Sequence, residues 1–321
     1  MTDGVSVLFV TGFPRSGSTV LGCLLNEMPE AFFGGELERL WTVLDSRRAS
    51  PCGCGERASR CALWREIVEG PVPGLAGLAD ADRDRRLAEL ADESARYAAG
   101  ASGPGAEPAA AGYPAVAAAL YREIARATGA LVVVDSSKRP SYARALARVR
   151  GIDPWVLHLV RDVRGAVFSR QRNRDLRLAE DRHPRPRLAR LRLPLLLADA
   201  LRWMRDNLEA RRARRWLPPG RYRRLRYEDF AAAPEETLAS LAAWLGLAPP
   251  IPARTPAGTL RLSGNHSISG NRNRHERGEV AIREDRAWAG GLTRLERGAL
   301  TLVTYPVARA LGYPGRATAR P

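Results

Sequence analysis

The hydrophobic positions of the chain fall into short strand-like runs that alternate with longer helical patterns. Apolar runs bounded by turn residues predict strands at residues 5–10, 131–134, 155–160 and 222–226. Apolar residues at helical spacing predict helices at residues 19–28, 79–99, 115–128, 141–149, 163–171, 195–216, 235–245 and 292–311. Short strands that alternate with helices are typical of a parallel sheet with helices on both faces, so the pattern predicts an α/β fold.

Two stretches interrupt this alternation without dividing the chain. Residues 98–112 are a low-complexity run of alanine, glycine and proline, which predicts a flexible linker or loop. Residues 172–194 are rich in arginine and are broken by proline, which predicts a mobile surface excursion. We therefore expect a single domain over residues 1–321, with helical and loop insertions.

Composition narrows the class of protein. With 45% hydrophobic and 27% charged residues among 321, the chain has an ordinary globular composition. No apolar run reaches the roughly 18–20 residues that a membrane-spanning helix needs. The N-terminus also lacks the basic region and the cleavage site of a signal peptide. We therefore expect a cytoplasmic protein without a membrane span, and the sequence leaves its oligomeric state unknown.

Arginine supplies nearly all of the positive charge. Lysine and arginine number 51 against 35 acidic residues, which gives a net charge of +16, and Lys138 is the only lysine among them. Such a composition is typical of a GC-rich genome, so codon bias explains part of it. A basic chain still suits an anionic ligand, because the arginine fork binds phosphate and sulfate bidentately. The arginines are dispersed and are not interleaved with aromatic residues, which disfavours nucleic acid as a partner.

The most informative segment follows the first predicted strand and opens the first predicted helix. It reads GFPRSGST over residues 12–19, and the exposed N–H groups of a helix N-terminus in this setting bind phosphate. The two glycines and Thr19 fit the P-loop pattern G-x4-G-K-[ST], but Ser18 replaces the lysine that reaches the β- and γ-phosphates. The segment therefore predicts a nucleotide without a triphosphate tail, with Arg15 as the cation of the loop. A plain glycine turn that begins a helix is the alternative.

A second strand-to-helix junction, at residues 156–169, offers another candidate phosphate site. Its sequence VLHLVRDVRGAVFS has Arg161 at the end of the predicted strand and Ser169 two turns into the next helix. Both side chains can donate hydrogen bonds to a phosphate. Taken alone, the Arg-Asp pair of this junction fits a structural salt bridge equally well.

Three of the four cysteines lie in one loop. Cys52, Cys54 and Cys61 form the pattern C-x-C-x6-C with glycines between. Structural zinc sites take four ligands, and no fourth cysteine or histidine lies nearby in the sequence. Reduced thiols in a tight loop are therefore favoured, as is usual inside cells. A local disulfide, or a metal shared with a distant residue, stays open.

The two candidate phosphate segments together resemble those of the sulfotransferases that use 3′-phosphoadenosine 5′-phosphosulfate (PAPS). The sequence PRSGST is similar to the family's 5′-phosphosulfate loop, and LVRDVRGAVFSR is similar to its 3′-phosphate motif, with Val163 where the family has proline. Further segments resemble the bacterial branch: CGCG at 52–55, DSSK at 135–138, Trp203 with Asn207, RYEDF at 226–230, and SGNRNR at 269–274, where Arg272 replaces a proline. The resemblance implies a P-loop NTPase-like parallel sheet flanked by helices, with insertions over the acceptor site.

The resemblance also implies a set of nucleotide-binding residues. These are Arg15, Ser16, Gly17, Ser18, Thr19, Arg161, Ser169, Tyr227, Arg274 and Arg277. Those of the loop would hold the 5′-phosphosulfate, Arg161 and Ser169 would hold the 3′-phosphate, and the two tail arginines would close over it. The sulfuryl group would pass in line from PAPS to a hydroxyl or amine of an acceptor, which requires positioning and charge neutralisation. The resemblance implies no metal in this reaction.

The acceptor must lose a proton, so a general base is needed. Glu36 follows Gly35 after the phosphate loop, as the base does in the tyrosylprotein branch, so the resemblance implies that Glu36 is the base. A structural partner of Arg15 is the alternative role for this carboxylate. Lys138 ends a predicted strand, where a compact ammonium group would suit the bridging or leaving oxygen of PAPS.

Cytosolic members of the family use a histidine as the base instead. His158 lies in an apolar predicted strand, which favours a core residue, and His183 lies in the arginine-rich excursion. His266 and His275 flank the tail motif and stay as candidates.

Two functions of other classes compete with sulfuryl transfer. Residues 131–135, LVVVD, resemble a Walker-B strand, whose Asp135 would bind Mg²⁺ in a P-loop kinase or NTPase. The missing P-loop lysine counts against that function. A non-enzymatic nucleotide or RNA binder is the further alternative. For the sulfotransferase we expect a small-molecule alcohol or phenol as the acceptor, with a peptide tyrosine as the alternative.

Overall fold

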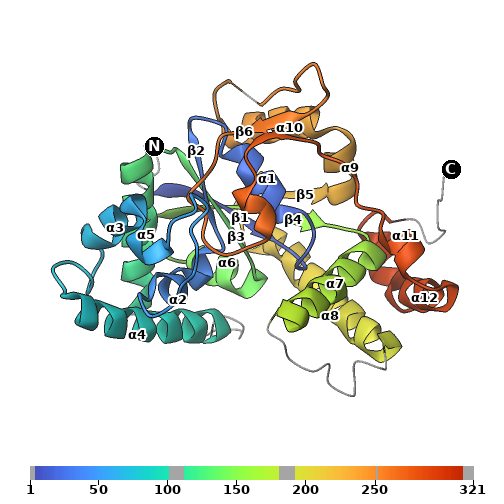
Figure 1. The fold of residues 1–321 in the computed structure, drawn as a ribbon, viewed down its shortest axis with the longest axis horizontal. Helices are drawn as coiled ribbons and strands as arrows, with labels where there is room; N and C mark the ends of the chain where they lie inside the picture. Colours follow the sequence, from blue (N-terminus) through green and yellow to red (C-terminus); the bar gives the residue numbers. More distant parts are fainter. Residues whose placement is uncertain (1–3, 101–111, 181–191, 251, 314–321) are drawn as a thin grey trace.

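A five-stranded sheet forms the centre of the protein in a computed structural model that describes residues 4–100, 112–180, 192–250 and 252–313. All four strand pairings are parallel. In spatial order (Figure 1), the strands are β2 (Ala31–Gly35), β3 (Val132–Lys138), β1 (Val5–Thr11), β4 (Ile152–Val160) and β5 (Tyr222–Arg226). The predicted α/β fold with a parallel sheet is thus confirmed.

The central strands are buried on both faces, which explains their continuous apolar sequences. Successive side chains of a strand point to opposite faces of the sheet. In β1, Val7 and Phe9 enter one hydrophobic cluster, whereas Leu8 and Val10 enter another, and all four are at most 2% exposed. Parallel strands covered by helices on both faces have this pattern.

Helices cover both faces of the sheet (Figure 1). The first face packs against α2 (Leu40–Leu44), α3 (Ala62–Glu69), α4 (Asp80–Gly100), α5 (Tyr113–Thr128) and α6 (Pro140–Leu146). The opposite face packs against α1 (Ser18–Leu25), α9 (Tyr227–Ala232) and α10 (Pro234–Leu245). A third cluster, beside the end of β4, joins α7 (Val163–Glu180), α8 (Arg192–Arg212), α11 (Trp288–Gly291) and α12 (Arg294–Ala310).

Short elements complete the fold. The strands β6 (Leu260–Leu262) and β7 (Gly278–Val280) form an antiparallel pair. The residues between them, 263–277, are called the tail segment below. Single 3₁₀ turns lie at η1 (Leu37–Arg39), η2 (Ala58–Arg60), η4 (Ala213–Arg215) and η5 (Arg272–His275). At the start of α12, Thr293 and Glu296 form a reciprocal capping box, which satisfies N–H groups that the helix itself cannot bond.

Most of the predicted elements are confirmed, and one prediction is wrong in part. The strand predicted at 222–226 has the predicted bounds, and the other three strands and all eight helices exist with one or both ends shifted. The elements that were not predicted are β2, β6, β7, α2, α3, α9 and α11. Residues 172–180 continue α7, and residues 192–194 begin α8, so the predicted mobile excursion is wrong at both ends. The remaining residues of that prediction, 181–191, and most of the predicted linker at 98–112 lie outside the described residues.

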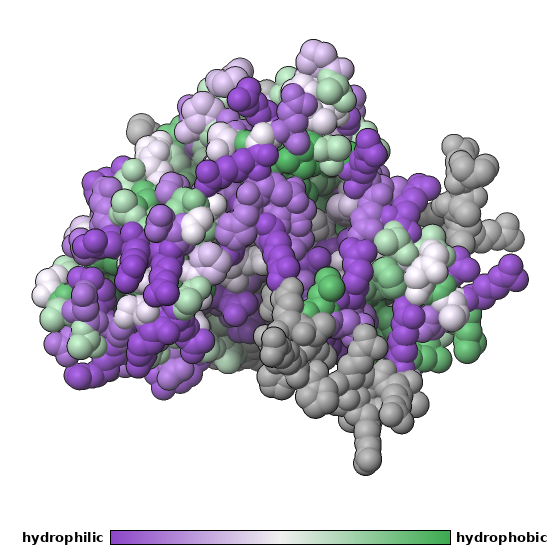
Figure 2. Space-filling model, viewed as in Figure 1, coloured by the Kyte–Doolittle hydropathy of each residue, from purple (hydrophilic) through white to green (hydrophobic). Residues whose placement is uncertain are grey.

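The surface agrees with the basic, polar composition. The face shown in Figure 2 is mainly hydrophilic. Among the described helices, none combines the length and the apolar character that a membrane crossing requires.

Candidate active site

A cavity of about 1820 Å³ lies at the carboxyl ends of the parallel strands. At least one lining residue lies at or just after the carboxyl end of each strand. Glu36 follows β2, Lys138 ends β3, Arg15 follows β1, Arg161 follows β4, and Tyr227 follows β5. Open parallel sheets bind their ligands at this edge, because the helices that follow the strands direct their N-termini toward it.

Backbone strain is concentrated in this cavity. Among the described residues, the non-glycine residues with positive φ are Arg15 (74°), Lys138 (66°) and Ser269 (55°). All three line the cavity. A left-handed backbone costs a non-glycine residue free energy, and such residues cluster at functional sites because the surrounding structure holds them there.

The loop between β1 and α1 requires both of its glycines. Gly12 has φ of 129°, and a Cβ there would lie 2.5 Å from the carbonyl oxygen of Leu159. Gly17 has φ of 91°, and its Cβ would lie 2.6 Å from the ring of Tyr227. No side chain caps the N-terminus of α1, which begins at Ser18. The first N–H groups of this helix can therefore bind an anion in the cavity.

The two candidate phosphate segments meet in the structure. Arg15 Nε donates to Ser169 Oγ over 3.1 Å, and Arg161 Nη1 donates to the carbonyl oxygen of Arg15 over 3.0 Å. The sequence separates these pairs by 154 and 146 positions. The adjacent strands β1 and β4 bring them together, so one anionic ligand with two phosphate groups could contact both segments.

Arg161 is held in place by its surroundings. Its side chain is 6% exposed, and its guanidinium carbon lies 4.5 Å from the centre of the Tyr227 ring. Arg161 Nη2 donates to the carbonyl oxygen of Asp285 over 2.8 Å and lies 3.2 Å from the Asp285 carboxylate. Burial raises the pKa of Asp285, but the N–H group of Ala287 and the Arg161 charge outweigh this effect and lower it. The Asp285 carboxylate is thus an anion already bound to Arg161.

A second group of contacts surrounds Glu36. Lys138 Nζ forms an ion pair with Glu36 Oε1. Ser269 Oγ donates to Glu36 Oε2 over 3.0 Å, and Arg39 lies 3.8 Å from the same oxygen. Burial raises the pKa of Glu36, but the Lys138 ammonium and the Ser269 hydroxyl outweigh this effect, so the pKa lies below its ordinary value. Among the described residues, the structure thus pairs Glu36 with Lys138 and not with Arg15.

A second carboxylate, Glu38, lines the same cavity. Burial raises its pKa to about 7, although Arg139, whose Nη1 lies 2.5 Å from Glu38 Oε1, opposes this shift. A carboxylate with a pKa near neutrality can exchange protons readily at physiological pH. Glu38 was not a candidate from the sequence, because its pKa depends on burial in the folded chain.

The other candidate nucleotide-binding residues divide into two groups. Gly17, Ser18, Thr19 and Ser169 line the cavity, whereas Ser16 does not, and its buried hydroxyl donates to the carbonyl oxygen of Phe13 over 2.8 Å. The two tail arginines do not line the cavity. They donate instead to the cysteine loop, Arg274 to the oxygen of Pro51 and Arg277 to the oxygen of Cys54, both over 2.8 Å.

Of the described residues, His158, His266, His275 and Asp135 lie outside the cavity lining. His158 is fully buried between Tyr222 and Asn207, and burial lowers its pKa to about 4, which confirms it as a core residue. His266 contacts the cysteine loop, and His183 lies outside the described residues. Asp135 is 1% exposed and accepts hydrogen bonds from Tyr121 and Ser137. This aspartate is thus a buried side chain whose hydrogen-bond donors, Tyr121 and Ser137, belong to the fold itself.

Some lining residues were not singled out by the sequence. Ser269 opens the tail motif and bonds Glu36, but only the folded tail reveals this contact. Further lining side chains are small ones of α4 and polar ones of α7: Ala91, Ala95, Ala98, Ala99, Arg172, Asn173 and Arg174. The spacing of the α4 alanines places them on one helix face, a signal that could have been read from the sequence.

Comparison with known proteins identifies the family. The model of the Sulfotransferase family matches residues 8–250, so the chain belongs to the sulfotransferase family. Among solved structures, the chain resembles the sulfotransferase domain of the olefin synthase of Synechococcus PCC 7002, with a TM-score of 0.54 and 18% identity over 98% of this chain and 97% of that chain. It also resembles the sulfotransferase domain of the curacin biosynthetic pathway, with a TM-score of 0.52 and 18% identity over 97% and 98%. At such identities the likeness shows the shared fold alone. A comparison with curated protein sequences gives no match.

Proposed function

We propose that the protein transfers the sulfuryl group of PAPS to a hydroxyl group of a small-molecule acceptor. One observation supports this proposal above the others. A pair of linked cationic phosphate-binding segments and a carboxylate–ammonium pair open into the same cavity. The first pair suits a nucleotide with phosphates at two positions, and the second suits proton removal beside a leaving phosphate.

The nucleotide half of the site is built around Arg15, Arg161 and Ser169. Arg15 and the N–H groups at the start of α1 would bind the 5′-phosphosulfate. Arg161 and Ser169 would bind the 3′-phosphate, with Tyr227 packed against Arg161. Because the Asp285 carboxylate already forms an ion pair with the Arg161 guanidinium group, the 3′-phosphate would either displace this carboxylate or share the guanidinium group with it.

The reacting half of the site is built around Glu36 and Lys138. The acceptor hydroxyl gives its proton to the Glu36 carboxylate as its oxygen forms a bond to sulfur. The bond from sulfur to the 5′-phosphate oxygen breaks, and the electron pair stays on the departing phosphate. Lys138 and Arg15 neutralise the charge that grows there, which is the main way in which such sites lower a barrier. The products are a sulfate ester and 3′-phosphoadenosine 5′-phosphate.

The low pKa of Glu36 has two consequences for this role. The carboxylate is ionised at neutral pH, so it is ready to accept a proton. Its basicity is weak as long as Lys138 is bound to it, since the ion pair favours the charged form. Attraction of Lys138 toward the leaving phosphate would weaken the ion pair and make Glu36 a stronger base at the moment of transfer.

The remaining wall of the cavity supports a bulky acceptor. The small side chains of the α4 alanines and the arginines of α7 line the same cavity as Glu36. We therefore propose an alcohol or phenol with an apolar body as the acceptor. A peptide tyrosine also carries a phenolic hydroxyl group, so tyrosine peptides are included in the acceptor screen described next.

A screen of acceptors tests this function. The protein is incubated with PAPS and a panel of phenols, alcohols and tyrosine peptides, without added magnesium, and the products are analysed by mass spectrometry. We expect a sulfated acceptor together with equimolar 3′-phosphoadenosine 5′-phosphate. Transfer of phosphate from ATP, dependent on magnesium and without any turnover of PAPS, would support the kinase alternative and overturn the proposal.

A further inference from the structure

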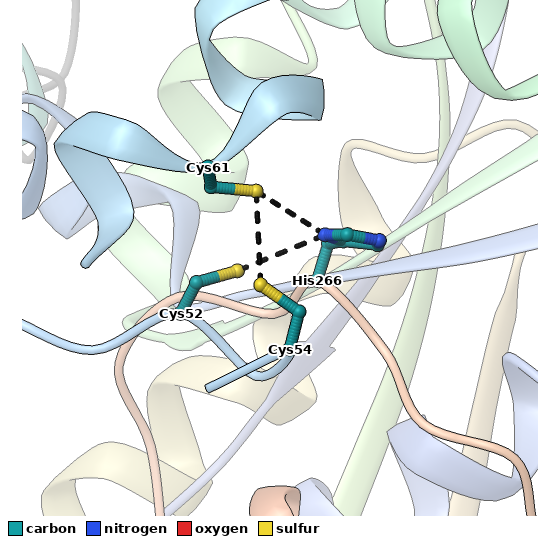
Figure 3. Close-up of side chains that lie close together, drawn as sticks. All are labelled: Cys52, Cys54, Cys61 and His266. Atoms are coloured by element: carbon teal, nitrogen blue, oxygen red, sulfur yellow. Dashed lines mark hydrogen bonds between the residues drawn. The ribbon is translucent and has the colours of Figure 1, made fainter. Parts of the chain in front are cut away.

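Three cysteines of one loop and one histidine lie close together in the fold, although the histidine is distant from them in the sequence. Figure 3 shows the sulfur atoms of Cys52, Cys54 and Cys61 close to one another, with a ring nitrogen of His266 facing the sulfurs of Cys52 and Cys61. Their ligand atoms all lie within 4.8 Å of one another. His266 follows Cys61 by 205 positions, so the fold supplies the fourth ligand that the local sequence lacks.

The distances suit a tetrahedral metal ion. With zinc–sulfur bonds near 2.3 Å and a zinc–nitrogen bond near 2.0 Å, a tetrahedron has ligand separations of about 3.8 Å between sulfurs and about 3.5 Å from sulfur to nitrogen. The sulfurs of Cys54 and Cys61 are 3.9 Å apart. His266 Nδ1 lies 3.2 Å from the sulfur of Cys61 and 3.9 Å from that of Cys52. A disulfide needs sulfurs about 2.05 Å apart, and all four cysteines of the chain are free.

Hydrogen bonds hold the four ligands in place. Gly55 N donates to the oxygen of Cys52 over 3.0 Å and closes the tight loop between the first two cysteines. Trp64 Nε1 donates to the oxygen of His266 over 2.8 Å, and Gly53 N donates to that of Ser267 over 2.9 Å. A ligand set that the protein orders through such contacts binds its metal more tightly.

We propose that Cys52, Cys54, Cys61 and His266 bind a structural zinc ion. Three thiolates and one imidazole are soft to borderline ligands, which zinc prefers over magnesium or calcium. Four protein ligands leave no open position for a reacting molecule, which is typical of a structural site. None of the four residues lines the cavity, so the zinc takes no part in the chemistry proposed for Glu36 and stands independently of it.

The zinc would fasten the tail of the chain beside the reacting groups. Two residues after His266, Ile268 bridges to both Cys52 and Gly35, and its oxygen accepts from Glu36 N over 2.9 Å. The next residue, Ser269, bonds the Glu36 carboxylate. Arg274 and Arg277, at the other end of the tail segment, donate hydrogen bonds to the same cysteine loop. The zinc site thus positions Ser269 against Glu36 through a few residues of backbone.

The metal content of the purified protein tests the site directly. The protein is expressed in zinc-supplemented medium, freed of any affinity tag, dialysed and measured by inductively coupled plasma mass spectrometry. We expect about one zinc ion per chain, and Co²⁺ in its place should give thiolate-to-cobalt charge-transfer bands and the visible bands of a tetrahedral ion. Zinc-free protein that takes up neither metal after reduction would overturn the proposal.

Substitutions identify the ligands. His266→Ala and Cys54→Ser should each weaken zinc affinity, measured by competition with a chelator, by more than the about 10–100-fold that loss of a supporting contact costs. His266→Cys should restore tight binding with an altered cobalt spectrum, because a fourth thiolate also completes a zinc site. Cys23→Ser is the matched control, since Cys23 is buried but outside the cluster, and it should keep its zinc. Unchanged zinc affinity in His266→Ala, or loss of zinc in Cys23→Ser alone, would contradict the ligand set.

Discussion

Substitution of Lys138 by methionine tests the ion pair at the centre of the proposed site. Lys138 and Glu36 are 14% and 18% exposed, so the pair lies between an exposed and a fully buried one. Exposed pairs contribute about 0–1 kcal/mol, whereas removal of one partner from a buried pair costs about 3–5 kcal/mol, so Lys138→Met should cost roughly 2–3 kcal/mol at pH 7. The variant leaves Glu36 with the Ser269 hydroxyl at 3.0 Å and Arg39 at 3.8 Å.

Urea denaturation of the four proteins of a double-mutant cycle measures this contribution. Glu36→Gln removes the charge that Lys138→Met leaves unpaired, so the double variant should regain part of the loss, with a coupling energy of about 1–3 kcal/mol. A coupling energy near zero would refute the ion pair as a stabilising contact.

The stability cost of Lys138→Met should also change with pH, and the direction of this change is a second test of the ion pair. In the wild type the pKa of Glu36 is lowered, so its contribution to stability is complete above the ordinary carboxyl pKa and is lost as the pH falls through the lower value. Without Lys138, only the Ser269 hydroxyl and the Arg39 charge oppose the effect of burial, so the pKa of Glu36 rises from its wild-type value. Less of the stabilisation by ionised Glu36 is then left to lose as the pH falls. The cost of Lys138→Met should therefore shrink on acidification, and a cost that grows would contradict the assignment.

Three further predictions concern catalysis, the phosphate loop and the core. Glu36→Gln should lower turnover about 10²–10⁴-fold with little change in nucleotide affinity, whereas a larger loss in Glu38→Gln would make Glu38 the base. Gly17→Ala should abolish PAPS binding in calorimetry, because its Cβ would lie 2.6 Å from Tyr227 at a φ of 91°; unchanged affinity would mean that the loop is dispensable. Burial lowers the pKa of His158 to about 4 from 6.5, so stability should fall by about 3 kcal/mol as the pH drops through that range, and a His158→Phe variant should lack this slope.

The sequence predicts the buried strands well because their apolar runs are buried on both faces. Residues 5–10 and 155–160 are mainly apolar, so they are stable only where they are buried, and the strands predicted there are confirmed. The strand β2 was missed because Ala31–Gly35 is short and ends in two glycines, which favour a turn by local preference. Its pairing with β3 decides its conformation, and that pairing is not local.

The partner of Glu36 shows why the site was predicted only in part. Glu36, Lys138 and Arg15 were each candidates, yet the sequence could not tell which cation the carboxylate meets. The strand order decides this, because β2 borders β3 and is separated by it from β1. Lys138 therefore lies next to Glu36, and Arg15 lies one strand further away. The same reason hid the cluster of His266 with the cysteine loop, since chain separation of that length carries no local signal.

Calorimetric titration with two nucleotides tests the central claim most directly. In the proposed site, Arg161 and Ser169 bind the 3′-phosphate, and a charge-assisted hydrogen bond contributes about 1.5–3 kcal/mol. The wild type should therefore bind 3′-phosphoadenosine 5′-phosphate at least about 10-fold more tightly than 5′-AMP. Ser169→Ala should reduce this preference, and Arg161→Ala should remove most of it. Equal affinity of the wild type for the two nucleotides would contradict the account.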